Sequence, residues 1–235
     1  MTVRIAMWSG PRNLSTAMMY SFAARGDTHV VDEPFYAAYL AQTGDDHPMR
    51  EAVLASQPTD PADVVKSLIS PVSESIFYQK QMAHHMHPDW PQDWMEGIKH
   101  VLLIRHPARV VASYAKKREA PTLEDLGFAQ QADILARTQA PIVVDSSDIR
   151  ARPAEMLQKL CDRVGIEWTP NMLRWPAGGH PSDGAWAPHW YGAVHQSTGF
   201  DTAEPEVPKL TGTYADLANA AMPFYEQLAA HKITI

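Results

Sequence analysis

The stretch IAMWSGPRNLSTAMM, residues 5–19, decides how the rest of the chain is interpreted. A short apolar run over Val3–Trp8 predicts a buried strand, and Ser9-Gly10-Pro11 interrupts it. A helical spacing of apolar residues, which begins with Leu14 and Met18, follows at once. A strand, a Gly/Pro turn and a helix make an anion site, because free backbone N–H groups and the positive end of the helix dipole converge there.

The side chains of this turn suit an anion. Arg12 adds a positive charge, and Ser15 and Thr16 add hydroxyl donors in the first helical turn. The turn is not a Walker A motif, because Gly10 is followed by neither the second glycine nor the lysine which that motif requires. The alternative is an ordinary strand–helix turn capped by Asn13 or Ser15.

Length, composition and charge narrow the class of protein. The chain has 235 residues, enough for one α/β domain with a full core. Its net charge of −7 disfavours a broad nucleic-acid surface, so an anionic ligand would need a local cluster of cations. We expect no membrane partner, because no apolar run approaches a membrane span. The N-terminus lacks the pattern of a signal peptide, and Cys161 is the single cysteine; both predict a cytoplasmic location. The oligomeric state stays open.

A carboxylate is expected beside the turn. Thr28–Asp32 reads as a second strand and is followed directly by Glu33. A strand–helix–strand order predicts a parallel unit, and in such sheets ligands bind at the carboxyl ends of the strands. Glu33 could therefore take a proton from an attacking hydroxyl group. It could equally pair with Arg12 or cap a turn.

The third predicted strand, Ser75–Lys80, ends in another charged residue. Lys80 is interpreted as a cation for the same anion pocket. His84, His85 and His87 follow, but a metal site is disfavoured because adjacent histidines cannot easily face one ion. His84 could line the substrate side of the pocket or be a structural histidine.

A second anion-binding pair follows the fourth predicted strand, His100–Arg105. Pro107 suits the first position of a helix over Ala108–Lys117. Arg105, at the strand end, and Ser113, two turns into the helix, could grip a second phosphate. Arg109 is interpreted as a solvated helix charge.

The rest of the chain completes the predicted domain. A helix is expected over Leu123–Gln139, then a strand over Pro141–Asp145, whose final aspartate is placed like a Walker B residue. A helix over Ala154–Val164 is followed by Gly165, a typical terminating residue. Cys161 lies at an apolar position of that helix and is expected in the core.

Two segments lie outside this strand–helix pattern. Residues 36–74 are expected to be a helical insertion that includes a helix at Pro61–Ile69, and they carry no recognisable chemistry. Residues 176–213 are rich in Pro, Gly and Trp and are expected to form a loop-rich lid. Its aromatic side chains could stack on a flat ligand such as a purine, or could simply pack against the core. A closing helix is expected at Tyr214–His231.

Two motifs together resemble those of the sulfotransferases. Ser9–Thr16 resembles the loop that holds the 5′-phosphosulfate in this family, whose fold is related to P-loop proteins but lacks Walker A. Arg105–Ser113, an arginine and a serine eight residues apart with Pro107 between them, resembles the family's 3′-phosphate motif. Asp32–Phe35 resembles the bacterial variant in which a glutamate after the second strand acts as base. The resemblance covers most of residues 3–175.

The chain departs from the family pattern at two places. The family loop more often carries Ser-Gly where this chain has Asn13-Leu14, and a leucine adopts a positive φ only at a cost. The usual Lys-Thr-His string after the third strand is absent, and Lys80 and His84 stand in its neighbourhood. Glu33 is therefore preferred over a histidine as the base.

The resemblance implies a fold, a reaction and a site. The fold is a three-layer α/β sandwich with a central parallel sheet, like that of the P-loop NTPases. The reaction moves a sulfuryl group from 3′-phosphoadenosine 5′-phosphosulfate to a hydroxyl or amine of a small molecule, without a metal. Glu33, Arg12, Lys80 and His84 would take part in catalysis. The residues that would bind the donor are Gly10, Pro11, Arg12, Asn13, Leu14, Ser15, Thr16, Arg105 and Ser113.

Two other functions stay open. A P-loop kinase or nucleotide hydrolase would need Mg²⁺, and the missing loop lysine argues against it. A non-catalytic nucleotide-binding protein with the same fold would bind the donor and transfer nothing. The tail resembles that of sulfotransferase-like proteins, some of which are named after aminotransferases, but the sequence shows no pattern for binding pyridoxal phosphate.

Overall fold

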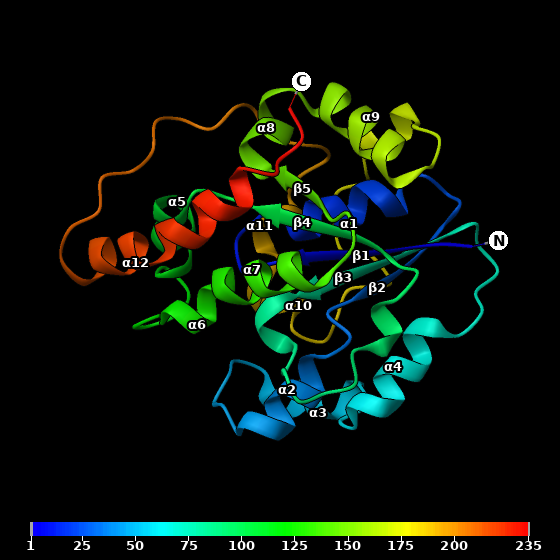
Figure 1. The fold of residues 1–235 in the computed structure, drawn as a ribbon, viewed down its shortest axis with the longest axis horizontal. Coiled ribbons are helices and arrows are strands. Elements are labelled where there is room, and N and C mark those ends of the chain that lie inside the picture. Colours follow the sequence, from blue (N-terminus) through cyan, green and yellow to red (C-terminus); the bar gives the residue numbers. More distant parts are fainter. Residues whose placement is uncertain (1, 235) are drawn as a thin grey trace.

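Five parallel strands form a single central sheet in the computed structural model, which describes residues 2–234 (Figure 1). Their order across the sheet is β2-β3-β1-β4-β5, so the predicted α/β class with a parallel sheet is confirmed. The predicted domain limits, residues 1 and 235, lie outside the described residues. The strands are β1 (Val3–Ser9), β2 (Thr28–Asp32), β3 (Ile76–Met82), β4 (Lys99–Ile104) and β5 (Ile142–Asp145).

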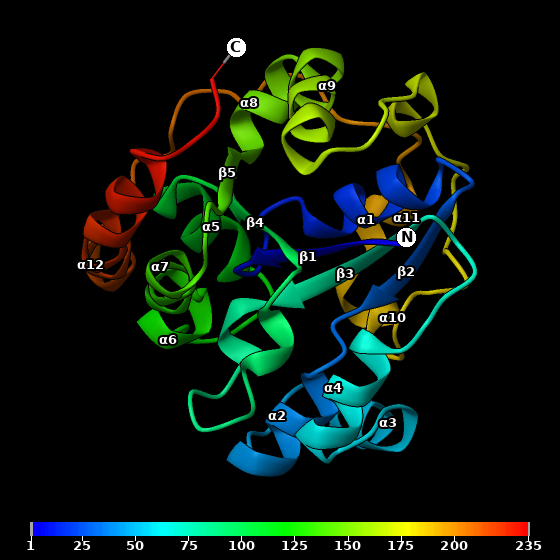
Figure 2. The ribbon, with the colours of Figure 1, turned by 45° about the vertical axis from the view of Figure 1, so that its right-hand side comes forward.

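A layer of helices covers each face of β1. Successive side chains of a strand point to opposite sides, so neighbouring residues of β1 pack against different layers. Ile5 and Met7 pack in a core cluster with α1 (Ser15–Ala23) and α9 (Pro153–Val164). Ala6 and Trp8 pack in a second cluster with residues of three other helices, within residues 107–114, 128–137 and 212–229. Figure 2 shows these two groups of helices on opposite sides of the sheet. The bounds of the second group are α5 (Pro107–Tyr114), α7 (Phe128–Arg137) and α12 (Gly212–Ala229).

Shorter helices complete the domain. The predicted helical insertion, residues 36–74, contains three of them, and α4 has the bounds expected from the sequence. Both views place these three together at one end of the molecule (Figure 1 and Figure 2). The remaining helical segments are α2 (Tyr36–Thr43), α3 (Arg50–Ser56), α4 (Pro61–Ile69), α6 (Leu123–Leu126), α8 (Ser146–Ala151), α10 (Ala187–Trp190), α11 (Gly192–His195), η1 (Ala83–His85), η2 (Asp93–Met95) and η3 (Pro170–Leu173).

The helix predicted over Leu123–Gln139 is wrong in one respect, because it is two helices. Gly127, with a left-handed φ of 74°, is both the residue that caps the end of α6 and the residue that caps the start of α7. Glycine tolerates that conformation, and here it also allows a close approach between chains. A Cβ added to Gly127 would lie 3.3 Å from the Cα of Gly10, in the predicted anion loop.

Most of the tail aromatics pack within the protein. Trp175 stands edge-on to Phe200, with ring centroids 5.2 Å apart, and Trp186 stands edge-on to Tyr36 at 5.0 Å. Both tryptophans are buried, so for them the packing alternative holds. Cys161 is buried in the core, as predicted. Within residues 2–234, no helix is both long enough and apolar enough to cross a membrane.

Candidate active site

The predicted anion loop lies where the order of the strands reverses. In the sheet, β3 and β2 lie on one side of β1, and β4 and β5 lie on the other. Ligands of such sheets bind at the carboxyl ends of the strands near this switch point. Two residues of the loop, Arg12 with φ 61° and Leu14 with φ 71°, adopt the left-handed region. Leu14 therefore takes the conformation that a glycine would take cheaply, at a cost of about 1–3 kcal/mol.

The N-terminus of α1 carries no side-chain cap. Leu14 stands at the cap position and accepts nothing through its side chain. Asn13 instead donates from Nδ2 to the backbone oxygen of Leu103, 3.1 Å away. The predicted alternative of an ordinary capped turn is therefore wrong. The first-turn N–H groups are left for an external acceptor, as expected of an anion site.

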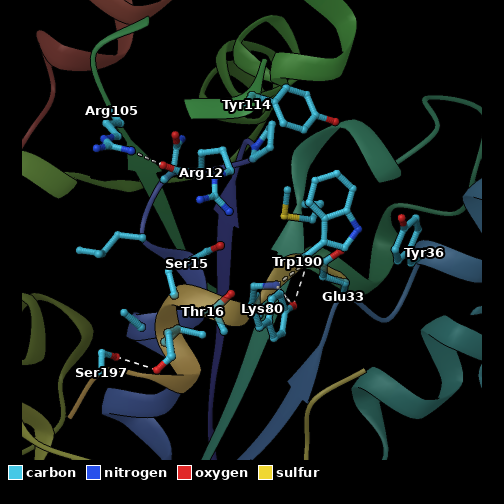
Figure 3. Close-up of a pocket in the computed structure, with 18 of the residues that line it drawn as sticks. Arg12, Ser15, Thr16, Glu33, Tyr36, Lys80, Arg105, Tyr114, Trp190 and Ser197 are labelled. Atoms are coloured by element: carbon cyan, nitrogen blue, oxygen red, sulfur yellow. Dashed lines mark hydrogen bonds and ion pairs between the residues drawn. The ribbon is translucent and has the colours of Figure 1, made fainter. Parts of the chain in front are cut away.

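A single cavity joins this loop to the predicted carboxylate. It has a volume of about 230 Å³ and is partly open to solvent. Figure 3 shows Arg12 and Ser15 on one side and Glu33, Tyr36 and Trp190 on the other. The predicted site residues among those lining it are Pro11, Arg12, Asn13, Leu14, Ser15, Thr16, Glu33, Lys80, His84 and Arg105.

Arg12 links the two residues of the predicted Arg105–Ser113 pair, because each of them is hydrogen-bonded to it. Arg12 donates from Nε to Ser113 Oγ over 2.9 Å, and Arg105 donates to the backbone oxygen of Arg12 over 2.7 Å. Burial, and then the charge of Arg105, lower the pKa of Arg12. Arg12 and Arg105 thus line one edge of the cavity, with Ser113 behind Arg12, although Arg105 and Ser113 do not bond to each other.

Beyond Arg105 lies a cluster of cations that the sequence did not reveal. The prediction that Arg109 is a solvated charge is wrong: its side chain is 12% exposed and its Nε lies 3.1 Å from a carboxylate oxygen of Glu204. Arg105 and Arg150 contact the same carboxylate. Glu204 comes from the segment before α12, distant in sequence, and so gave no local signal.

The opposite side of the cavity holds a buried cluster of charges. Asp32 and Lys80 are register partners in β2 and β3, so their side chains share one face of the sheet. Lys80 Nζ lies 2.8 Å from Asp32 Oδ1 and also bonds to Glu33 Oε1. Lys80 is 1% exposed, and its single positive charge faces these two carboxylates. The alternatives in which Glu33 pairs with Arg12 or caps a turn are therefore replaced by a pair with Lys80.

Tyr191, which sequence reasoning missed, completes this cluster. Its hydroxyl accepts from Lys80 Nζ at 2.7 Å and from Trp186 Nε1 at 2.9 Å. It shares its single proton between Asp32 Oδ2, at 2.8 Å, and Glu33 Oε1, at 3.2 Å. A tyrosine of the tail thus fixes one oxygen of Glu33.

Glu33 keeps a second oxygen on the cavity side. Among residues 2–234 no hydrogen bond reaches its Oε2, and His85 Nδ1 lies 3.8 Å from it. Burial raises the pKa of Glu33; the charge of Lys80 opposes the rise and that of Asp32 adds to it. A carboxylate with a raised pKa is a stronger proton acceptor, which suits a general base.

The histidines beside Glu33 are buried and uncharged. Burial lowers the pKa of His84 to about 4 and that of His85 well below its usual range. Neither Nδ1 atom has a hydrogen-bond partner among the described residues, and both histidines line the cavity. The His85 ring stacks on Tyr36 at 4.4 Å, which makes this wall aromatic. This wall would accept a flat or apolar molecule, and the Nδ1 atoms of His84 and His85 could accept hydrogen bonds from that molecule.

The acidic groups near the strand ends do not form a metal site in the described part of the chain. Asp145, predicted to be placed like a Walker B residue, accepts from Ser147 N on Oδ1 and from Tyr225 OH on Oδ2, each at 2.8 Å. Both of its oxygens are thus engaged within the fold. In the described part of the chain, no three side chains among His, Cys, Asp and Glu are grouped so that they could hold a metal ion.

The chain is similar to known proteins over nearly its whole length. Residues 3–232 match the family model described as "Sulfotransferase domain". Two proteins of Arabidopsis thaliana, branched-chain-amino-acid aminotransferase-like proteins 1 and 2, are 37% and 34% identical over 232 residues, 97% of this chain. The chain spans 42% and 41% of their lengths.

Two solved structures share the fold. The sulfotransferase domain of the Synechococcus PCC 7002 olefin synthase superposes with a TM-score of 0.57 at 18% identity, covering 93% of this chain and 94% of that one. The sulfotransferase domain of the curacin biosynthetic pathway gives 0.54 at 14% identity, covering 97% and 98%.

Proposed function

Because this chain belongs to the sulfotransferase domain family, we propose that it transfers a sulfuryl group from 3′-phosphoadenosine 5′-phosphosulfate to a hydroxyl or amine of a small molecule. One observation carries the proposal. The uncapped N-terminus of α1 and Arg12 face Glu33 Oε2 across a single cavity. An anion-binding end and a proton acceptor thus lie on either side of the space where transfer would occur.

The chemistry follows from these two ends. The acceptor oxygen or nitrogen attacks sulfur, the bond between sulfur and the bridging phosphate oxygen breaks, and adenosine 3′,5′-bisphosphate leaves. Glu33 Oε2 takes the proton that the acceptor loses. The charge that develops on the bridging oxygen is stabilised by Arg12 and by N–H groups at the start of α1, and each such donor is worth about 3–4 kcal/mol.

The neighbouring groups hold the base in place. Lys80 and Tyr191 bond to Glu33 Oε1, which leaves Oε2 for the acceptor. His84 is neutral at pH 7 and is a poorer base, so in this proposal it binds the acceptor. The aromatic wall of Tyr36, His85 and Trp190 favours an acceptor with an apolar or aromatic body.

A calorimetric titration tests the proposal. Adenosine 3′,5′-bisphosphate should bind at least about tenfold more tightly than 5′-AMP, because the 3′-phosphate adds charge-assisted hydrogen bonds. ATP with Mg²⁺ should bind more weakly than the bisphosphate. Preference for ATP with Mg²⁺ would instead indicate a kinase, and binding of the bisphosphate without transfer to any screened acceptor would indicate a non-catalytic protein.

The proposal also covers the location of the protein, its partners and the absence of a metal from the reaction. A cytoplasmic location is supported by the single, buried cysteine, which fits a reducing compartment. No nucleic-acid partner is expected, because the net charge is −7 and the cations found at the site are clustered. No metal enters the proposed reaction.

A further inference from the structure

The cations beyond Arg105 surround one internal carboxylate. Glu204 bonds to Arg105, lies 3.1 Å from both Arg109 Nε and Arg150 Nη1, and accepts from Ser147 Oγ at 2.7 Å. Its side chain is only 2% exposed, although it belongs to a segment without helix or strand. This segment, in orange in Figure 1, leads to α12.

The charges of this cluster do not balance. Three guanidinium groups face a single carboxylate, so an excess of two positive charges remains around Glu204. Asp201 reaches only Arg150, at 3.5 Å, and is 78% exposed, so solvent screens its contribution. A phosphate monoester carries a charge of about −1.5 to −2 and three acceptor oxygens, which fits these donors better than a carboxylate does.

A free donor supports the same conclusion. Arg105 Nε is buried and has no hydrogen-bond partner among residues 2–234. The carboxylate therefore leaves unused part of the donor capacity that converges here. Arg105 also donates to the backbone of Arg12, so the cluster adjoins the anion loop directly.

We propose that Arg105, Arg109 and Arg150 form a phosphate site in which Glu204 acts as an internal substitute for the ligand. The proposal rests on the proposed function, since it assigns the site to the 3′-phosphate of the donor. The donor must displace Glu204 together with its segment, residues 201–211. In the free protein, the Glu204 carboxylate thereby occupies the phosphate site. The apparent affinity for the donor then equals the intrinsic affinity multiplied by the fraction of molecules in which the site is open.

The segment has a means of release. Its contacts with the cluster are polar: Arg150 Nε donates to the backbone oxygen of Thr202 at 3.1 Å, and Arg109 to that of Pro205. Thr202, Ala203 and Pro205 are exposed, whereas Leu210, near the end of the segment, packs against the core. Exchange of one anion for another therefore costs little packing where the part of the segment around Glu204 moves and Leu210 stays in place. Burial alone would raise the pKa of Glu204, but Ser147 and the arginines bring it below its usual value, so mild acid does not open the site.

Titrations of Glu204→Gln test this inference, with Glu206→Gln as control because Glu206 is exposed in the same segment. Glu204→Gln should bind adenosine 3′,5′-bisphosphate at least about tenfold more tightly than wild type. Its affinity for 5′-AMP should stay within about twofold. Titration with inorganic phosphate alone should reveal one site more in Glu204→Gln than in wild type. Glu206→Gln should match wild type throughout.

Limited proteolysis gives a second measurement that needs no variant. In wild type, the bisphosphate or saturating phosphate should accelerate cleavage within residues 201–211, because the segment is displaced. Unchanged affinities and phosphate stoichiometry in Glu204→Gln would overturn the inference, as would bisphosphate binding with unchanged or slower cleavage of that segment. An added phosphate site in Glu204→Gln, with no preference for bisphosphate over 5′-AMP in any variant, would support the internal substitute and refute the proposed donor.

Discussion

At the scale of single residues, the site depends on how one carboxylate is held. Glu33 follows β2 with a φ of 42°, and its N–H donates to the backbone oxygen of Lys80 over 2.9 Å. This strained position turns its side chain back onto Lys80 and toward the cavity. A left-handed glutamate is costly, so its presence beside a pocket favours a functional reason.

Replacing the proposed base tests its role. Glu33→Gln should lower kcat by about 10²–10⁴-fold, because it removes the proton acceptor, while the affinity for adenosine 3′,5′-bisphosphate changes little. His84→Gln is the matched comparison and should lower kcat by less than about tenfold. Steady-state kinetics and calorimetry on both variants measure this. An equal loss in His84→Gln would move the role of base to the histidine.

The pH profile of the reaction depends on Tyr191. Burial raises the pKa of Glu33, and the hydrogen bond from Tyr191 partly lowers it. Activity should therefore fall as the pH drops through a value above that of an ordinary glutamate, about 4.3. Tyr191→Phe removes the bond and should move this acid limb to a still higher pH, as a profile of kcat/KM would measure. A shift to lower pH would contradict the assignment.

The same substitution has a structural cost. Tyr191→Phe leaves the buried Trp186 Nε1 without its acceptor, so the free energy of unfolding should fall by about 1–3 kcal/mol. Urea unfolding measures this loss separately from the pH profile. A variant as stable as wild type would show that the indole finds another acceptor.

At the scale of elements, the anion loop depends on a contact between two glycines. A Cβ at Gly10 would lie 2.0 Å from the backbone oxygen of Leu126, far inside van der Waals contact. That oxygen is fixed because α6 ends at Gly127 in the left-handed conformation. The break between α6 and α7 therefore supports the loop from behind.

Gly10→Ala should consequently displace the loop. We expect a loss of about 1–3 kcal/mol in the free energy of unfolding, from overpacking against backbone, together with weaker binding of the bisphosphate. Gly192→Ala is the control, since no heavy atom lies within 4 Å of its added Cβ. Chemical unfolding and calorimetry measure both effects. Normal stability and affinity in Gly10→Ala would show that α6 can move aside.

The elements differ in how far the sequence predicts them. The bounds of β2 and α4 are those expected, because apolar patterning and an Asp-Pro start are local signals. The break at Gly127 was not predicted, since a helical pattern tolerates an isolated glycine. Helix α8 was not predicted because its start depends on Asp145, which resembles a Walker B aspartate in position and instead caps the helix.

The site was predictable where its residues follow strand ends, and unpredictable where they come from the tail. Arg12, Glu33 and Lys80 line the cavity because parallel strands end at one edge of the sheet. Tyr191 and Glu204 reach the site from 111 and 99 residues away from their partners Lys80 and Arg105. No pattern within a single element encodes such contacts.

At the scale of the whole molecule, buried histidines couple stability to pH. Burial lowers the pKa values of His47, His84, His85 and His100. The unfolded chain binds protons near a pKa of about 6.5, whereas the native protein resists protonation until lower pH. Protons therefore favour the unfolded state in this interval. Glu33, whose native pKa is raised, has the opposite effect, but it is a single group.

The free energy of unfolding should consequently fall as the pH is lowered from 7 toward 5. Each histidine that stays neutral in the native state contributes about 1.4 kcal/mol per pH unit once the pH lies below about 6.5. Urea unfolding across this range measures the slope. His84→Gln should reduce the slope by one such contribution, while His231→Gln, at an exposed position, should leave it unchanged. A stability that stays constant or rises between pH 7 and 5 would show that these imidazoles are protonated within the native protein.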